Sequence, residues 1–233
     1  MNVIVNRQPT GDEMPANAQA QIHLLGIDVD DVNTFATEMV TIVSDTNWIQ
    51  KLNPLAKASY EATALRTIAA LVEIFNTSNG QISKTFGEFM VSLSAAQTLA
   101  DELAHHSFPL SEVWKEKLTG NHGFDYYSEC PDEVINCGEA KYNSTNNAYG
   151  AAARQVCEFI DDKKDLGDLV HLNYFASQVA VNKLVGARER GFCLAFSVNS
   201  DDLEQILVNA LSNTDVIRLS EEVIALYIIG IRS

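Results

Sequence analysis

The sequence predicts an α/β (α+β) fold in which a helical N-terminal half packs on a small mixed β-sheet flanked by helices. Two features predict it. Apolar residues recur at helical spacing between Asp28 and Ala104, and after Pro109 short apolar strands alternate with turns and helices. A chain of 233 residues is long enough to bury a hydrophobic core without disulfides or a structural metal. We therefore expect a single domain over residues 1–233.

The N-terminal part is expected to be mainly helical. Residues 1–25 are polar and contain Pro9, Gly11 and Pro15, so they are predicted to form an irregular arm or, at Val3 to Val5, a short edge strand. Beyond the arm we expect a helical part over residues 28–106. Its three helices are predicted over residues 28–44, 56–75 and 86–104.

A nuclease-like αβ core is expected over residues 110–233. Strands are predicted over 124–128 and 134–142, and the turn residues between them favour an antiparallel pair. A further strand is expected over 191–198, and the nearly all-apolar segment 222–231 suits a sheet centre. Helices are predicted over 147–161, 177–186 and 201–211, the last capped by Ser200.

Charge and hydropathy exclude several classes of protein. Asp and Glu number 31 against 16 Lys and Arg, a formal net charge of -15, so the surface as a whole does not attract a polyanion. The longest apolar stretch, Val223 to Ile231, is far shorter than the roughly 20 residues of a spanning helix. Residues 1–14 do not resemble a signal peptide, and the four cysteines form no C-x-x-C pair. We expect a cytoplasmic protein with reduced cysteines and no membrane partner.

The candidate chemistry lies on the predicted strand pair. Side chains two residues apart on a strand share a face, so Glu139 and Lys141 stand side by side while Ala140 points away. If the two strands pair, Asp125 lies near Glu139, and two carboxylates with the Ala140 carbonyl form an oxygen set suited to Mg²⁺ or Mn²⁺. The plainer alternative is an exposed charge pair on an edge strand, with Asp125 in a turn.

These residue types suit the hydrolysis of a phosphodiester. A divalent metal held by Asp125 and Glu139 acts as a Lewis acid and lowers the pKa of a bound water. Lys141 can orient that water or stabilise the charge that builds on the phosphate. The three residues are together sufficient for this reaction.

The same residues resemble a known family. Gly123-Phe-Asp125 followed by Gly138-Glu-Ala-Lys141 resembles the motif of the PD-(D/E)xK, restriction-endonuclease-like nucleases, over about residues 86–160, although Phe124 stands where Pro is usual. With Gly87-Glu88 and Cys137 to Tyr142 included, the pattern is similar to the HamA nuclease subunits of Hachiman anti-phage systems, which work with a helicase. The resemblance implies a metal-dependent DNA nuclease with Glu88 as a further metal ligand. The alternative for Glu88 is a solvent-facing acid near a helix N-terminus.

Candidate contacts to DNA lie after Lys141, the part of the chain in which acidic residues do not predominate. We expect Arg154 and Gln155, on the helix that follows the Lys141 strand, to face a phosphate or backbone oxygen. Lys183, Arg188 and Arg190 are predicted to extend this surface. Each of these residues also has the simpler interpretation of an ordinary surface residue. Tyr142 either borders a nucleotide or is a half-buried residue at the strand end.

The sequence therefore favours a Mg²⁺-dependent endonuclease acting on DNA as the effector subunit of an anti-phage defence complex. So acidic a chain binds DNA poorly by itself, which makes dependence on a helicase or other ATPase partner physically reasonable. Two alternatives remain: a non-catalytic acidic interaction or regulatory subunit on a nuclease-like scaffold, and a stand-alone restriction endonuclease.

Overall fold

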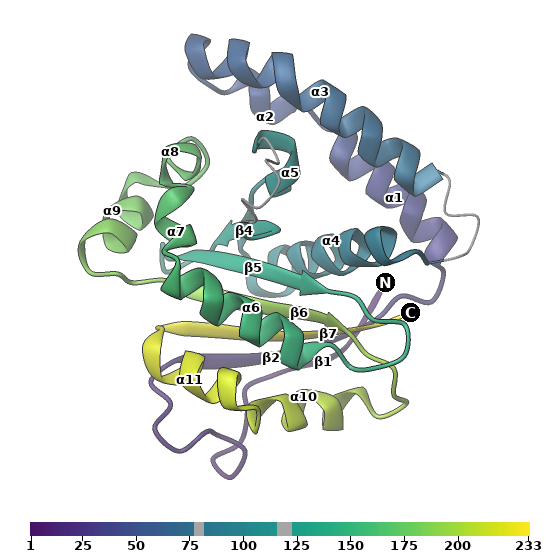
Figure 1. The fold of residues 1–233 in the computed structure, drawn as a ribbon, viewed down its shortest axis with the longest axis vertical. Coiled ribbons are helices and arrows are strands. Elements are labelled where there is room, and N and C mark those ends of the chain that lie inside the picture. Colours follow the sequence, from purple (N-terminus) through teal and green to yellow (C-terminus); the bar gives the residue numbers. More distant parts are fainter. Residues whose placement is uncertain (77–81, 116–122) are drawn as a thin grey trace.

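The computed structural model describes residues 1–76, 82–115 and 123–233. Within them the chain forms one seven-stranded sheet of order β1-β2-β7-β6-β5-β4-β3, with helices around it (Figure 1). The strands are β1 (Asn2–Arg7), β2 (Gln21–Asp28), β3 (His106–Ser107), β4 (Tyr126–Glu129), β5 (Ile135–Lys141), β6 (Gly191–Ser197) and β7 (Ala225–Arg232). The helices are α1 (Val32–Ser44), α2 (Asn47–Gln50), α3 (Pro54–Asn76), α4 (Lys84–Leu103), α5 (Ser111–Trp114), α6 (Tyr149–Asp161), α7 (Lys164–Gly167), α8 (Leu169–Leu172), α9 (Gln178–Gly186), α10 (Leu203–Leu211) and α11 (Thr214–Glu222).

The sheet is mixed, as predicted. Strands β2, β7, β6 and β5 run parallel to one another, while β1 pairs antiparallel with β2 at one end of the sheet. At the other end β4 pairs antiparallel with β5, and β3 with β4. Parallel neighbours need long crossovers, and here helices α6 to α9 join β5 to β6 while α10 and α11 join β6 to β7. The predicted fold class, helices packed on a small mixed sheet, is confirmed.

Helices cover both faces of the sheet. On one face, α6 crosses β5 and β6 (Figure 1). There the Tyr149 ring contacts Phe196 and the Phe159 ring contacts Phe124. Helices α10 and α11 pack on the same side as α6, since α11 contacts both α6 and α10. On the opposite face α4 packs on β5, β6 and β7. The interior strands are consequently buried, including every residue of β6, and the apolar β7 segment lies inside the sheet as predicted.

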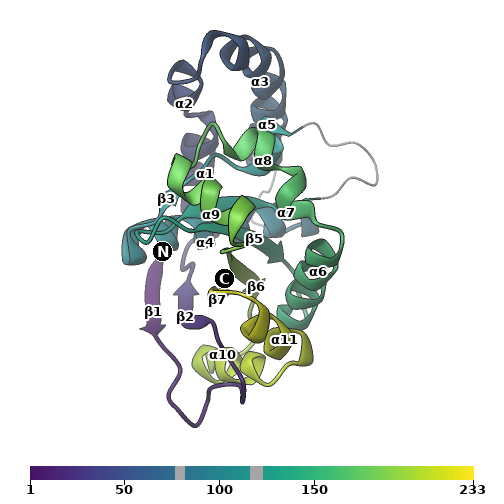
Figure 2. The same cartoon turned by 90° about the vertical axis from the view of Figure 1, so that its left-hand side faces the viewer.

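The helices α1 to α3 project beyond one edge of the sheet (Figure 2). The 23-residue α3 packs against α1 and α5, with the buried Tyr60 as its largest anchor. The Tyr60 ring meets Trp48 edge to face at 5.6 Å and lies 6.5 Å from Phe175. The predicted helices over 28–44, 56–75 and 86–104 correspond to α1, α3 and α4.

The prediction of an irregular arm over residues 1–25 is wrong. This segment contains β1 and most of β2, and only the expected edge strand at Val3 to Val5 survives, as part of β1. Strand β2 lies between β1 and β7, with Leu24, Leu25 and Ile27 fully buried. Its partner β7 comes at the other end of the chain, so no local sequence pattern reports the pairing.

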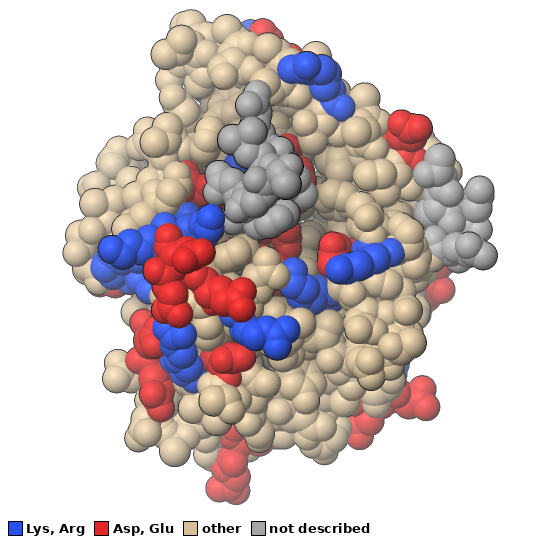
Figure 3. Space-filling model, viewed as in Figure 1, with Lys and Arg blue, Asp and Glu red and all other residues tan. Residues whose placement is uncertain are grey.

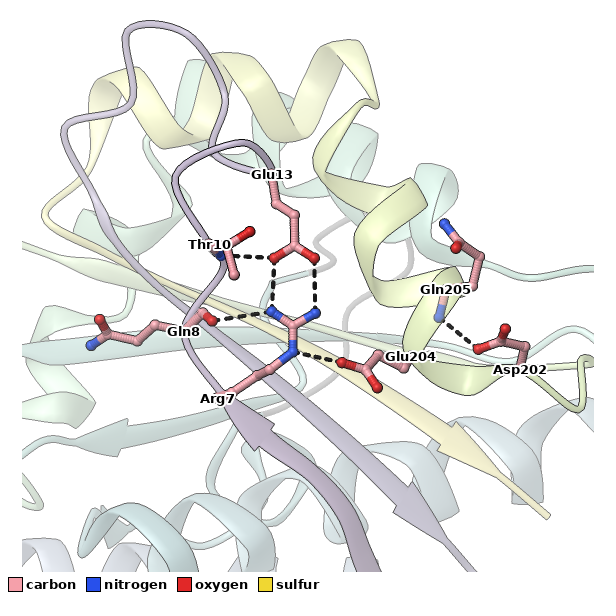
Figure 4. A network of polar contacts seen from close by, with 7 residues as sticks. All are labelled: Arg7, Gln8, Thr10, Glu13, Asp202, Glu204 and Gln205. Atoms are coloured by element: carbon pink, nitrogen blue, oxygen red, sulfur yellow. Dashed lines mark hydrogen bonds and ion pairs between the residues drawn. The ribbon is translucent and has the colours of Figure 1, made fainter.

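Charged contacts tie the N-terminal loop to the C-terminal part of the chain (Figure 4). Arg7 makes a two-pronged ion pair with Glu13, at 2.7 and 3.0 Å, and its Nε donates to Glu204 on α10 at 2.7 Å. The guanidinium lowers the pKa of Glu13 to about 2. At the C-terminal ends of the neighbouring strands β2 and β7, the Arg232 guanidinium donates to both oxygens of the Asp28 carboxylate, at 2.7 and 2.8 Å.

Two further sequence expectations need correction near the C-terminus. The N-cap of α10 is Asp202, whose carboxylate accepts from the Gln205 N–H, whereas the Ser200 hydroxyl accepts from the Asp202 N–H just before the helix. Glu222 ends the unpredicted helix α11 instead of starting the last strand, which begins at Ala225. The four cysteines are free and buried. No helix in the described ranges is long and apolar enough to cross a membrane.

Candidate functional site

The β4–β5 hairpin brings Asp125 beside the Glu139–Lys141 segment. In the antiparallel register Tyr126 lies opposite Gly138, and just before it the Asp125 N–H donates to the Gly138 carbonyl at 2.9 Å. The Asp125 side chain turns along β5, where its Oδ2 accepts from the Ala140 N–H at 2.8 Å. The Asp125 carboxylate thus takes the place of the backbone acceptor that β4 no longer supplies to the Ala140 N–H.

Gly138 is required for this register because of a close approach. A Cβ atom at position 138 would lie 2.3 to 2.5 Å from three atoms of the Tyr126 ring, which crosses the glycine directly. Any side chain would push that fully buried ring away and displace the start of β4. Gly138 therefore helps to fix Asp125 at the level of Ala140.

Glu139 is almost completely buried, with a side chain only 1% exposed. Its Oε1 accepts from the Lys141 Nζ at 2.6 Å, while Oε2 has no hydrogen-bond partner in the structure. Burial raises the pKa of Glu139 well above its ordinary value, and the nearby Asp125 and Glu88 charges raise it further against the lowering effect of Lys141. The site therefore contains a carboxylate whose ionisation the protein alone opposes.

Lys141 connects this buried acid to the surface. Burial lowers the pKa of Lys141, but the charges of Glu139, Asp125 and Glu88 outweigh that effect, and the net shift is upward. The side chain is therefore a cation at neutral pH and cannot serve as a general base. Its 22% exposure reflects its position in the wall of an open cleft.

We call this hollow the β5 cleft; it has a volume of about 870 Å³ and lies between the start of α4, the end of β5 and the start of α6. Lys141, Glu88, Arg154 and Gln155 all contribute to its wall. The structure thus brings four of the predicted site residues to one cleft. Asp125 and Glu139 are not among its lining residues; Glu139 is bonded to Lys141 in the cleft wall, and Asp125 is bonded to the N–H of the preceding residue, Ala140. Glu88 is partly exposed, and its carboxylate lies 3.8 Å from the Lys84 ammonium one helical turn earlier.

The donor set can be compared with the needs of a divalent metal. Among the described residues, no group of three or more His, Cys, Asp and Glu side chains is arranged to hold an ion. Mg²⁺, however, is commonly held by one or two carboxylates and keeps several waters. Asp125 and Glu139 supply two carboxylates, and the unpartnered Glu139 Oε2 is an acceptor that a cation would satisfy. The Ala140 carbonyl points to the same side of β5 as its N–H, toward Asp125. This set fits Mg²⁺ or Mn²⁺.

The other predicted DNA contacts lie elsewhere. Lys183 on α9 donates to the Asp132 carbonyl at 2.7 Å, at the turn that joins β4 to β5. Arg190 is buried just before β6, whose register puts it beside the first residue of β5, about 20 Å along the strand from Lys141. Both Arg188 and Arg190 pair with the fully buried Asp165, at 2.7 and 3.4 Å. The expectation that Lys183, Arg188 and Arg190 extend one basic surface from Lys141 is therefore not met.

The distribution of surface charge is consistent with the separation of Lys183, Arg188 and Arg190 from Lys141. Figure 3 shows Lys and Arg side chains interspersed with Asp and Glu over α6 and its surroundings, without a continuous basic surface. The cations that share the β5 cleft with Lys141 come from α4 and α6, and they include Lys84, which the sequence analysis did not single out. A lysine at the first residue of a helix carries no distinguishing sequence signal, and only the packing of α4 against β5 brings it to the cleft.

Comparison of the chain with protein-family models, with curated proteins and with solved structures yields no match.

Proposed function

We propose that the protein is a metal-dependent nuclease that hydrolyses phosphodiester bonds of DNA. The observation that carries the proposal is the buried Glu139 carboxylate, with one oxygen on Lys141 and the other without a partner, near enough to Asp125 for the charge of that residue to raise the pKa of Glu139. A protein gains nothing in stability by keeping such a group, whereas a metal site needs one.

The roles of the residues follow from their chemistry. Asp125, Glu139 and the Ala140 carbonyl would hold Mg²⁺ or Mn²⁺, which when bound supplies a Lewis acid and an activated water. Lys141, a cation at neutral pH, can donate hydrogen bonds to a phosphate oxygen and stabilise the charge that grows on it. Glu88 lines the same cleft and is a candidate for a further contact to the metal through water.

The biological setting is proposed on the resemblance alone. Similarity to Hachiman nuclease subunits suggests an effector of anti-phage defence that acts with a helicase. The charge of -15 supports dependence on a partner, because contacts to phosphates dominate the affinity of proteins for DNA and Asp and Glu outnumber Lys and Arg in this chain by 31 to 16.

A second candidate function is a non-catalytic interaction subunit on a nuclease-like scaffold. The observation that favours it is the 1% exposure of the Glu139 side chain, since an ion must reach that carboxylate past Lys141. The two candidates differ in whether the protein cuts nucleic acid.

The test is metal-dependent cleavage by purified protein. Labelled single-stranded and duplex DNA would be incubated with 10 mM Mg²⁺ or Mn²⁺, with EDTA as the metal-free control. We expect cleavage that Glu139→Gln and Lys141→Gln each reduce by at least about a hundredfold. Glu158→Gln, an exposed acid on α6, and Arg66→Gln, an exposed cation on α3, serve as charge-matched controls and should cleave normally. Equal cleavage by all variants would mean that the activity does not come from this site.

A further inference from the structure

The β5 cleft gathers positive charge in an acidic protein. Lys84 from α4, Lys141 from β5 and Arg154 from α6 line it, and Glu88 is the one carboxylate among the lining residues. Lys84 is 79% exposed and Arg154 is exposed as well. Three cations from three separate elements therefore face one hollow, while the chain as a whole carries a charge of -15.

Two aromatic rings lie among these cations. The Tyr142 ring lies flat against Gly87 of α4, where a Cβ atom would come within 2.3 to 2.6 Å of three ring atoms. Tyr149, the first residue of α6, meets Phe196 edge to face at 5.7 Å between ring centroids. Both tyrosines are partly exposed and both line the cleft. Each ring is thus braced from behind by the protein and borders the cleft.

We infer that the β5 cleft binds single-stranded nucleic acid, with Tyr142 and Tyr149 as stacking surfaces for bases and Lys84, Lys141 and Arg154 as contacts to phosphates. This inference deepens the proposed function by naming the strandedness of its substrate. A positively charged groove interleaved with aromatic side chains is the arrangement by which proteins bind single strands without reading sequence.

The alternative substrate, a duplex, fits the surface less well. Duplex bases are stacked on one another inside the helix, so the two tyrosines would have no base to bind. Proteins that hold a duplex commonly make about 6 to 10 phosphate contacts, whereas the cleft offers three cations. Arg188 and Arg190 do not line the cleft, and both pair with Asp165.

Binding can be measured without turnover. Fluorescence anisotropy in EDTA would compare a labelled 15-nucleotide oligo-dT, an oligo-rU of the same length and a 15-base-pair duplex, at 20 to 150 mM salt. We expect the single strands to bind at least about tenfold more tightly than the duplex. The logarithm of their affinity should fall with the logarithm of salt concentration with a slope of about -2, the value for three phosphate contacts on a single strand.

Variants separate stacking from charge. Tyr149→Leu keeps apolar contact with Phe196 but removes the ring, and should weaken single-strand binding about tenfold, whereas Tyr149→Phe should not. Lys84→Gln and Arg154→Gln should each reduce the salt slope by about 0.7, and Arg66→Gln, outside the cleft, should leave it unchanged.

The inference is overturned if the duplex binds as tightly as the single strands, or if Tyr149→Leu binds like the unmodified protein while both are folded by circular dichroism. Tighter binding of either oligo-dT or oligo-rU supports it and assigns the sugar preference. If single strands bind as described but no strand is cut with Mg²⁺ or Mn²⁺, the proposed nuclease function fails and the binding site stands.

Discussion

Replacement of Glu139 by Gln tests the central claim about the site through stability alone. In the folded protein, burial and the charge of Asp125 raise the pKa of Glu139 well above its ordinary value of 4.5. A group whose pKa is raised by folding stabilises the fold fully below its unfolded pKa, and that contribution is lost as the pH rises through the folded pKa. Gln has the shape of the protonated acid and does not titrate, so Glu139→Gln retains the contribution at every pH.

The magnitude follows from linkage. The two proteins should be equally stable near pH 4, where Glu139 is protonated both folded and unfolded. Above pH 4.5 the advantage of the variant should grow by about 1.4 kcal/mol for each pH unit, up to the folded pKa. For a chain of this length that corresponds to about 3 to 6 °C in Tm for each unit. The Gln carbonyl can still accept from Lys141, so the cation keeps a partner.

The assay is chemical and thermal unfolding of both proteins between pH 4 and 8 in EDTA. Glu158→Gln on the exposed face of α6 is the matched control and should follow the unmodified protein at every pH. If the stability difference between Glu139→Gln and the unmodified protein does not change with pH, or if the variant is the less stable protein at pH 7.5, folding does not raise the pKa of Glu139 and the reasoning is refuted.

Three other predictions concern the metal, a buried histidine and a buried ion pair. Mg²⁺ or Mn²⁺ should stabilise the unmodified protein in thermal shift, by about 2.7 kcal/mol at a hundredfold excess over Kd, and leave Glu139→Gln unchanged; an equal shift in both would contradict the assigned ligand. Burial lowers the pKa of His105 to about 4, so its contribution to stability is complete above pH 6.5 and is lost as the pH falls toward 4. His105→Gln should reduce the loss of unfolding free energy between pH 6.5 and pH 4, measured by urea unfolding, by up to about 3 kcal/mol. An unchanged pH dependence would exclude His105 as the source of that loss. Asp165→Ala leaves Arg188 and the buried Arg190 without their carboxylate and should cost about 3 to 5 kcal/mol, against less than about 1 kcal/mol for Asp161→Ala at the exposed Arg218 pair; equal costs would refute the difference in burial as the cause.

Local patterns in the sequence were enough to predict the strands and helices that carry the candidate site residues. The hairpin of β4 and β5 follows from two short apolar runs around the turn at Cys130 to Glu133, and period-two alternation then puts Glu139 and Lys141 on one face. Helices α3, α4 and α6 follow from their apolar spacing in the same way. Each of these predictions depends on residues within about 20 positions of one another.

Interactions between distant parts of the chain could not be predicted in this way. Residues 1–25 read as a polar segment, yet β2 begins within them and becomes an interior strand because β7 pairs with it from the other end of the chain. Arg188 and Arg190 read as surface cations, yet both pair with Asp165, which lies more than 20 residues before them in the sequence. Lys84 and Tyr149 carry no motif, and they reach the β5 cleft only through the packing of α4 and α6 on the sheet.

The depth of Glu139 also distinguishes a site from a surface charge pair. Exposed pairs contribute little and require no particular surroundings, as with Arg218 and Glu222 on α11. Glu139 is instead enclosed, and the nearby charges of Asp125 and Glu88 oppose its ionisation, while Lys141 is hydrogen-bonded to it. An apolar residue at position 139 would pack on the sheet without the cost of burying a carboxylate, so the stability of the fold does not account for Glu139, whereas the proposed metal site would.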